Sequence, residues 1–389
     1  YGQAEYNWKN RYYLEGDLAI ETNSQFGKDA ASGFKLAGAR WGVFPSLQAG
    51  WVVTNEKFFD VKGIDYLKLT AGFGVSGNDN VSYDANRTYF SSTLFMNGVA
   101  GLYLNNIGNT NLQWESTKRF NAGIQMNLLN NRLGLNFNYF KSWTNNLLTL
   151  QELGFVSGLE YNWSNGGSLE NTGFDASINA HIIAHKDWNW SVGAGVGHYV
   201  NTLTALPDDA KYWDTEVLGG TIRSIVGGAI NNFYGYRTNG VFATSEENDP
   251  TLNPNALYMT DETGAKIYFE AGDMRFVDVN GDHEINEKDC SVLGTSNPKL
   301  YGNLFTSLSW KNLTLDGSFN YSLGNDAYNY MRQQLESGSR FMNQTTAMMN
   351  RWTHEGMVTN MPKATYGDPM GNSRFSDRWI EDASYLKLK

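Results

Sequence analysis

Residues 116–148 read STKRFNAGIQMNLLNNRLGLNFNYFKSWTNNLL, two stretches of alternating polarity joined by a short polar turn. One face of the first stretch is apolar throughout and carries Phe120, Ala122, Ile124, Met126 and Leu128. After the turn, the same alternation resumes with Leu133, Leu135, Phe137 and Tyr139. Successive side chains of a strand point to opposite faces, so this period of two predicts a hairpin with one apolar and one polar face.

The same hairpin pattern recurs along the chain, with short turns near Lys186–Asp187 and Lys311–Asn312. Between the hairpins lie four much longer segments, approximately 79–115, 149–167, 205–298 and 324–377. Loops of this length are unusual in compact soluble domains, whereas outer-membrane barrels alternate short periplasmic turns with long extracellular loops. We therefore predict an all-β fold: an antiparallel transmembrane β-barrel, of which about 11–12 strands are present.

A soluble β-sandwich or a repeat-built adhesin would also show alternation, because any half-buried sheet does. Two features favour the barrel. The polar faces consist of Asn, Gly, Ser, Thr and Gln instead of the Lys and Glu of a solvated sheet. Aromatic residues also gather at strand ends, where a barrel places its girdles; they are Trp51, Tyr139, Trp143, Trp188, Trp190, Trp310 and Tyr321.

Composition excludes several other classes of protein. No apolar run approaches the roughly 18 residues of a transmembrane helix. The net charge of −10 argues against nucleic acid as a partner. Cys290 is the only cysteine, so an internal disulfide is impossible. We find no nucleophile elbow or phosphate-binding loop, and His181 and His185 have helical spacing on an expected strand. We therefore expect no enzyme activity.

The stretch DVNGDHEINEKD, residues 278–289, has the spacing of a calcium-binding loop. Calcium prefers six to eight oxygen ligands, which an EF-hand-type loop supplies from alternate positions. His283 replaces the usual glycine, so it must enter the left-handed region. An acidic surface turn without an ion is the alternative. We expect Ca²⁺, with Mg²⁺ as second choice, held by Asp278, Asn280, Asp282, Glu284 (through its backbone carbonyl), Asn286 and Asp289.

Aromatic side chains in the long segments are candidates for contact with a cargo. Aromatic rings stack on sugars or peptide side chains, and a nearby polar group fixes hydroxyls or carboxylates. Packing within the loops, or against a partner, is the alternative for each of them. The predicted contact residues are Tyr161, Trp163, Tyr212, Trp213, Tyr234, Tyr236 and Arg237.

From Phe44 onward the chain resembles the C-terminal part of the SusC/RagA family, the TonB-dependent transporters of Bacteroidetes outer membranes. The resemblance spans nearly the whole chain. It rests on motifs in the family's order, which are FPSLQAGW (44–51), YLKLTAGFGVSGN (66–78), LQWESTKRFNAGIQMNLLNNRLGLNFNYF (112–140), GYRTNGVF (235–242), GDMRFVDVNGDHEINEKD (272–289), NPKLYGN (297–303) and FSDRWIEDASYLKLK (375–389).

This resemblance implies a 22-stranded barrel that encloses an N-terminal plug and imports oligosaccharides or peptides. It also implies a SusD-like surface lipoprotein as a lid, a TonB complex that acts through the plug, and a possible dimer of such pairs. Nothing in the sequence resembles the plug, and SYLKLK would open one of the last strands, so we expect the chain to be incomplete. The alternative function is a β-rich surface adhesin or scaffold without transport.

Overall fold

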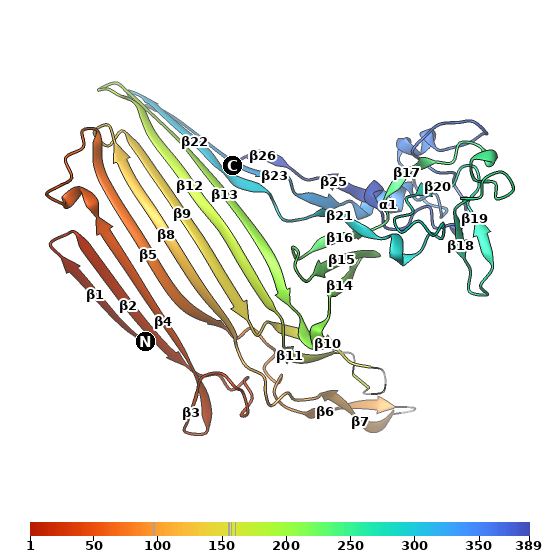
Figure 1. Ribbon diagram of the computed structural model, residues 1–389, viewed down its shortest axis with the longest axis horizontal. Helices are drawn as coiled ribbons and strands as arrows, with labels where there is room; N and C mark the ends of the chain where they lie inside the picture. Colours follow the sequence, from red (N-terminus) through yellow and green to blue (C-terminus); the bar gives the residue numbers. More distant parts are fainter. Residues whose placement is uncertain (96–97, 155, 157, 160) are drawn as a thin grey trace.

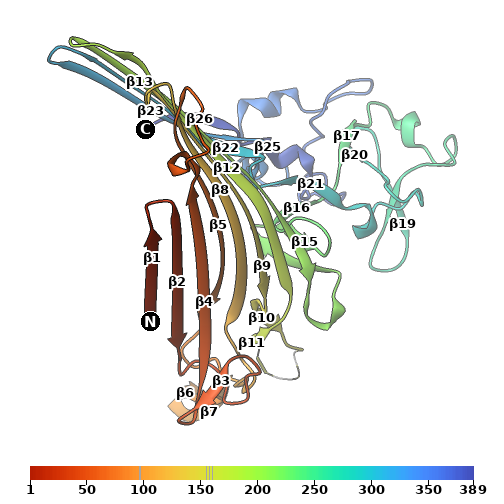
Figure 2. The same cartoon turned by 60° about the vertical axis from the view of Figure 1, so that its left-hand side comes forward.

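The computed structural model describes residues 1–95, 98–154, 156, 158–159 and 161–389; the remaining five positions, inside two of the predicted loops, lie outside the described residues. One curved antiparallel sheet of twelve strands dominates the fold (Figures 1 and 2), as the sequence predicts. Its strands are β1 Gly2–Trp8, β2 Tyr12–Glu21, β3 Phe34–Leu36, β4 Ala39–Val52, β5 Ile64–Asn78, β8 Glu115–Leu128, β9 Leu133–Asn145, β12 Ser168–Ala184, β13 Trp188–Ala205, β22 Leu300–Trp310, β23 Leu313–Leu323 and β26 Tyr385–Leu388.

Consecutive strands of the sheet pair as hairpins. In the hairpin of residues 116–148, Met126 lies opposite Leu135 and Gln125 opposite Asn136, so the apolar and polar faces stay in register. The turn between β8 and β9 is tight because Asn130 and Asn131 adopt positive φ angles of 58° and 59°, a conformation that asparagine tolerates better than most residues.

The turn ends of the strands carry paired aromatic rings. Trp188 on β13 stacks on Trp310 on β22, with ring centroids 5.6 Å apart. Tyr12 stacks on Trp51 in the same way, at 6.4 Å. Both pairs join neighbouring strands in register. An aromatic girdle at the membrane interface has this arrangement.

The long connections run over 79–114, 146–167, 206–299 and 324–384. The last one extends beyond the predicted limit of 377 because β25 pairs with β24, outside the main sheet. The connections contain β6 Tyr89–Phe95 with β7 Val99–Asn106, β10 Leu148–Glu152 with β11 Tyr161–Asn165, β14 Tyr212–Val217, β15 Gly220–Ile225, β16 Asn232–Gly235 and β21 Ser291–Thr295 in one sheet, β17 Thr238–Val241 with β20 Met274–Phe276, β18 Tyr258–Thr260 with β19 Lys266–Tyr268, β24 Asp326–Tyr328 with β25 Ile380–Asp382, and α1 Tyr330–Glu336.

The two longest connections fold together into one unit, which we call the loop body (residues 206–299 and 324–384). Its interior is a cluster of buried side chains that includes Phe269, Phe276 and, from the second connection, Met370. Figure 1 shows the blue and cyan segments gathered beside the sheet. Within the described part of the chain, no helix has the length and apolar character needed to cross a membrane.

Candidate functional site: the polar face of the sheet and the loop body

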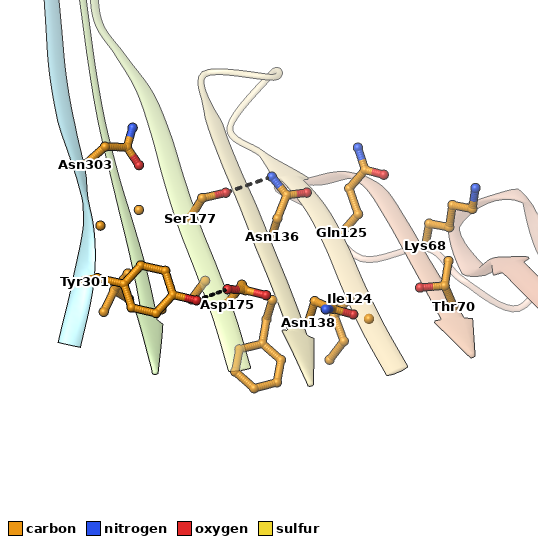
Figure 3. Close-up of a pocket in the computed structure, with 17 residues that line it drawn as sticks. Lys68, Thr70, Ile124, Gln125, Asn136, Asn138, Asp175, Ser177, Tyr301 and Asn303 are labelled. Atoms are coloured by element: carbon orange, nitrogen blue, oxygen red, sulfur yellow. Dashed lines mark hydrogen bonds between the residues drawn. The ribbon is translucent and has the colours of Figure 1, made fainter. Parts of the chain in front are cut away.

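Polar side chains form rows that cross the sheet from strand to strand. Cross-strand register joins Gln125 to Asn136 and Asn136 to Ser177. The Asn136 Nδ2 donates to Ser177 Oγ at 3.2 Å. Figure 3 shows these groups lying side by side. The complete row contains Lys68, Gln125, Asn136, Ser177, Gly195, Asn303 and Asn320.

A second polar row lies two residues along each strand, on the same face. It contains Thr70, Gly123, Asn138, Asp175, Gly197, Tyr301 and Ser322. All members of the two rows except Asn320 and Ser322 line an open hollow of about 460 Å³. Lys68 and Asp175 are the ionisable groups of opposite charge among its lining residues, and the rest of its polar lining is neutral.

The other face of the same strands is apolar and exposed. Its rows include Ile124, which is 43% exposed, and Phe137, which is also 43% exposed. In Figure 3 the side chain of Ile124 points away from that of Gln125, the next residue on β8. A broad exposed apolar face is costly in water and is the outward face that a transmembrane barrel presents to lipid.

Glycines on the polar face make room for larger neighbours on the next strand. A Cβ at Gly197 would lie 2.5 Å from Tyr301 Cζ, and one at Gly195 would lie 2.5 Å from Asn303 Oδ1. The Tyr301 hydroxyl reaches Asp175 Oδ1 at 3.5 Å. The glycine-rich run of β13 is therefore a packing surface for the side chains of β22.

The predicted calcium loop is closed by its own acidic side chains. Asp289 is fully buried and accepts hydrogen bonds from the backbone N–H groups of Val279 and Asn286, both at 2.9 Å. Asp278 accepts from the backbone of Gly281 and His283, at 2.7 and 2.8 Å. These bonds hold the first and last positions of the motif in one compact loop.

His283 has a φ of 66°, which confirms that the residue replacing glycine enters the left-handed region. Ile285 packs into the core of the loop body, and its N–H donates to the carbonyl of Tyr258 at 2.8 Å. Hydrogen bonds from the backbone of Glu284 and from Asn280 Nδ2 engage the two oxygens of Asp282. The backbone bond is the main reason that the pKa of Asp282 is lowered.

No group of three or more His, Cys, Asp or Glu side chains within the described ranges is gathered closely enough to hold a metal ion. The oxygens of the loop bind backbone amides. A carboxylate accepts more than one bond per oxygen, so the same side chains retain lone pairs for a cation. Calcium at this loop stays a prediction.

Two of the predicted contact residues enclose a single arginine. The Arg223 guanidinium lies between Tyr212 and Tyr234, 3.8 and 3.7 Å from their ring centroids. Asp214 holds the same guanidinium through two hydrogen bonds of 2.7 and 2.5 Å. The bond to Asp214 raises the pKa of Arg223. Trp213, which is 40% exposed, belongs to the opposite face of β14.

The other predicted contact residues lie elsewhere. Tyr236 packs against the core of the loop body, and burial raises its pKa to about 12. Arg237 donates to the carbonyl of Val292 at 2.6 Å. Tyr161 and Trp163 are on β11, and the Trp163 indole N–H donates to Ser82 Oγ at 3.1 Å. The structure therefore separates the seven residues into distinct neighbourhoods.

Sequence reasoning overlooked the charged groups that organise the loop body. Arg332 bridges Glu336 and Glu381 at 3.0 and 2.9 Å. Burial lowers the pKa of Arg378 to about 10. Asp214 and Arg223 were also missed. The sequence signal that could have found Asp214 and Arg223 is the alternation of side chains on either side of the Leu218–Gly219 turn. This alternation predicts a hairpin in which the two residues lie opposite each other.

The wall of polar and apolar faces, with paired aromatics at the turn ends, defines a transmembrane β-barrel protein. A family model described as TonB dependent receptor-like, beta-barrel matches residues 1–329. The chain belongs to this family, whose members are outer-membrane receptors and not enzymes, in agreement with the sequence prediction.

Curated relatives match across the whole chain. TonB-dependent receptor P3 of Formosa agariphila is 28% identical over 400 residues, and TonB-dependent receptor SusC of Bacteroides thetaiotaomicron is 27% identical over 413 residues. The match covers all of this chain but only 37% and 36% of those relatives. A solved structure of the RagAB peptide transporter has a TM-score of 0.80 at 23% identity, covering 100% of this chain and 40% of that one. The SusC/RagA resemblance is confirmed.

Proposed function

We propose that the chain forms part of the wall and the outer loops of a transporter that imports oligosaccharides or peptides, energised by TonB. Family membership supports an outer-membrane receptor. The similarity to SusC and to the RagAB peptide transporter supports nutrient uptake of this type. The chain spans less than two-fifths of its curated relatives, so the activity belongs to the longer protein.

The two polar rows are the observation that carries this proposal. Neutral amides and hydroxyls offer hydrogen bonds to a polar cargo without trapping it by charge. The opposite face has the apolar character that lipid requires. Cargo passes along the polar rows in this proposal. An adhesin would need no continuous polar face behind an apolar one, so we favour import over the adhesin or scaffold alternative.

Two neighbouring residues on opposite faces test the proposal. In the full-length receptor, Asn136→Trp places a bulky ring on the polar face, and the control Phe137→Trp changes only the apolar face. We expect Asn136→Trp to lower the uptake of labelled cargo at least tenfold at equal surface expression, and Phe137→Trp to change it less than twofold. Equal uptake by both variants would refute passage along these rows.

The partners we propose are a SusD-like lipoprotein as a lid over the loop body and a TonB complex that acts through a plug domain. A dimer of such pairs is a further proposal. The exposed loop body and the similarity to SusC support a lid. Co-purification of the full-length receptor with a lipoprotein, lost when residues of the loop body are deleted, tests this partnership.

We also propose Ca²⁺, before Mg²⁺, at residues 278–289, where it would stiffen the loop body. The left-handed His283 and the buried Ile285 support a loop of the calcium-binding type. Asp278, Asp282 and Asp289, with Asn280, Asn286 and the Glu284 carbonyl, would supply the oxygens. Calcium-dependent protection of this segment from hydrogen exchange is the direct test.

A further inference from the structure

One strand of the loop body has an open edge. β14 is the last strand of the four-stranded sheet β14–β15–β16–β21 and pairs with β15 on one side only. Figure 1 shows it as the outermost strand of this group. Its residues are exposed except for Asp214, which is half-buried. An uncovered strand edge carries unpaired backbone groups that another strand can bind.

The register shows which backbone groups of β14 point outward. The Val226 N–H donates to the Lys211 carbonyl at 2.9 Å, so these opposite residues form a hydrogen-bonded pair. Hydrogen-bonded pairs alternate along an antiparallel ladder. Trp213, Thr215 and Val217 therefore bond to β15. The N–H and C=O groups of Tyr212, Asp214 and Glu216 point toward the free edge.

The hairpin turn supports the same assignment. Leu218 and Gly219 have φ angles of 53° and 75°, which is typical of a two-residue turn that follows a hydrogen-bonded pair. That pair is Val217 with Gly220. In the described part of the chain, no residue donates to or accepts from the outward backbone groups of Tyr212, Asp214 and Glu216.

The edge is held rigid before any partner arrives. Arg223 is fixed by Asp214 and lies between Tyr212 and Tyr234, so β14, β15 and β16 are tied together on one face. Thr221 Oγ1 donates to Glu216 Oε1 at 2.6 Å and adds a second link between β14 and β15. A preorganised edge loses little conformational entropy on binding.

We propose that the free edge of β14 binds an extended peptide by adding it as a further strand. Six outward backbone groups span about 14 Å at roughly 3.4 Å per residue, which suits a segment of five or six residues. Backbone pairing supplies affinity and alternate side chains supply selectivity. Exposed Trp213 and Val217 favour apolar side chains on one face of the peptide, while Glu216 favours polar or basic ones on the other. A sugar chain has no matching ladder of N–H groups.

This inference deepens the proposed import function, on which it rests, by naming peptides as the cargo bound at this edge. The test uses full-length receptor and a mixture of capped random hexapeptides. Glu216→Pro removes one outward N–H group, and an edge strand tolerates proline there. The matched control Glu216→Ala loses the same carboxylate but keeps the N–H group. Protection of the Ile222 and Ser224 amides shows whether the hairpin is intact.

We expect Glu216→Pro to retain about tenfold fewer peptides than Glu216→Ala, because both variants lose the same carboxylate and only the proline variant also loses the outward N–H group. Hexapeptides N-methylated at every residue should be retained no better than background. The inference is wrong if the wild type retains no peptide, if both variants behave alike, or if N-methylated peptides bind equally well. Retention of maltodextrins that depends on the Glu216 N–H group would make the edge a glycan site instead. Nutrient uptake that persists in any of these cases leaves the import function intact.

Discussion

Gly197 of β13 lies directly against the ring of Tyr301 on β22, and a Cβ at this glycine would meet Tyr301 Cζ at 2.5 Å. The glycine is required for space, because the ring reaches across the neighbouring strand toward Asp175. Such contacts let a large polar side chain of one strand lie across the backbone of the next. The glycines on the polar face are therefore needed to make room for these side chains.

Gly197→Ala should lower the stability of the barrel, because the new methyl group forces the Tyr301 ring to move. Overpacking of this kind costs typically about 1–3 kcal/mol. Gly134→Ala is the matched control, since a Cβ there meets nothing closer than 3.7 Å. Urea unfolding of the full-length receptor in detergent measures both. Equal stability of the two variants would show that Tyr301 moves without cost.

Calcium should stabilise the loop body in a way that depends on Asp282. At a concentration about 100 times its Kd, a bound ion adds about 2.7 kcal/mol. Chelator should therefore speed hydrogen exchange in residues 278–289 of the wild type. Asp282→Asn keeps the size of the side chain but removes one negative charge. Chelator should therefore change hydrogen exchange less in this variant than in the wild type. Asp261→Asn, in a turn outside the motif, should respond like the wild type. Exchange unchanged by chelator would rule out calcium.

Arg223→Ala should loosen the hairpin of β14 and β15. The substitution removes two cation–π contacts, each worth roughly 0.5–1 kcal/mol at exposed sites, and leaves Asp214 without its partner. Arg223→Lys keeps the charge but cannot make the two-pronged bond to Asp214, so we expect an intermediate loss. Hydrogen exchange at Ile222 and Ser224 reports the effect. Full protection in Arg223→Ala would show that the arginine is not structural.

The loop body should lose stability in acid through Glu381. Hydrogen bonds from Asn329 and the nearby Arg332 lower the pKa of this carboxyl below 4.5 in the folded state. The unfolded state then binds a proton more readily. This contribution is therefore present above about pH 4.5 and is lost as the pH falls through the lower, folded pKa.

Pepsin digestion between pH 5 and pH 2 measures this loss. Cleavage within 324–384 should increase on acidification in the wild type. In Glu381→Gln we expect more cleavage of this segment at pH 5 than in the wild type, and a smaller increase in cleavage as the pH falls. A variant with the pH profile of the wild type would assign the acid sensitivity to other carboxyls.

The wall of the barrel is predictable from sequence because its strands pair with their neighbours along the chain. The alternation around residues 116–148 specifies which side chains share a face, and the short turn fixes the register. The observed opposition of Gln125 and Asn136 follows directly. The exposed apolar row through Ile124 was likewise foreseeable from the pattern alone.

The loop body is less accessible to such reasoning, because its contacts are distant in sequence. β16 pairs with β21 across more than fifty residues, and Met370 completes a core begun by Phe242. Short strands of three to six residues show too little periodicity to predict. Tyr212 and Tyr234 were recognised as exposed-looking aromatics, but Arg223, which joins them, became visible only in three dimensions.

The shared interior of the loop body also constrains how such a protein changes over generations. Phe276 from the first connection and Met370 from the second fill the same space. Exchange of one connection for that of a relative would leave a void or a clash beneath the other. The two segments are therefore expected to be inherited as a pair, while the wall between them diverges independently.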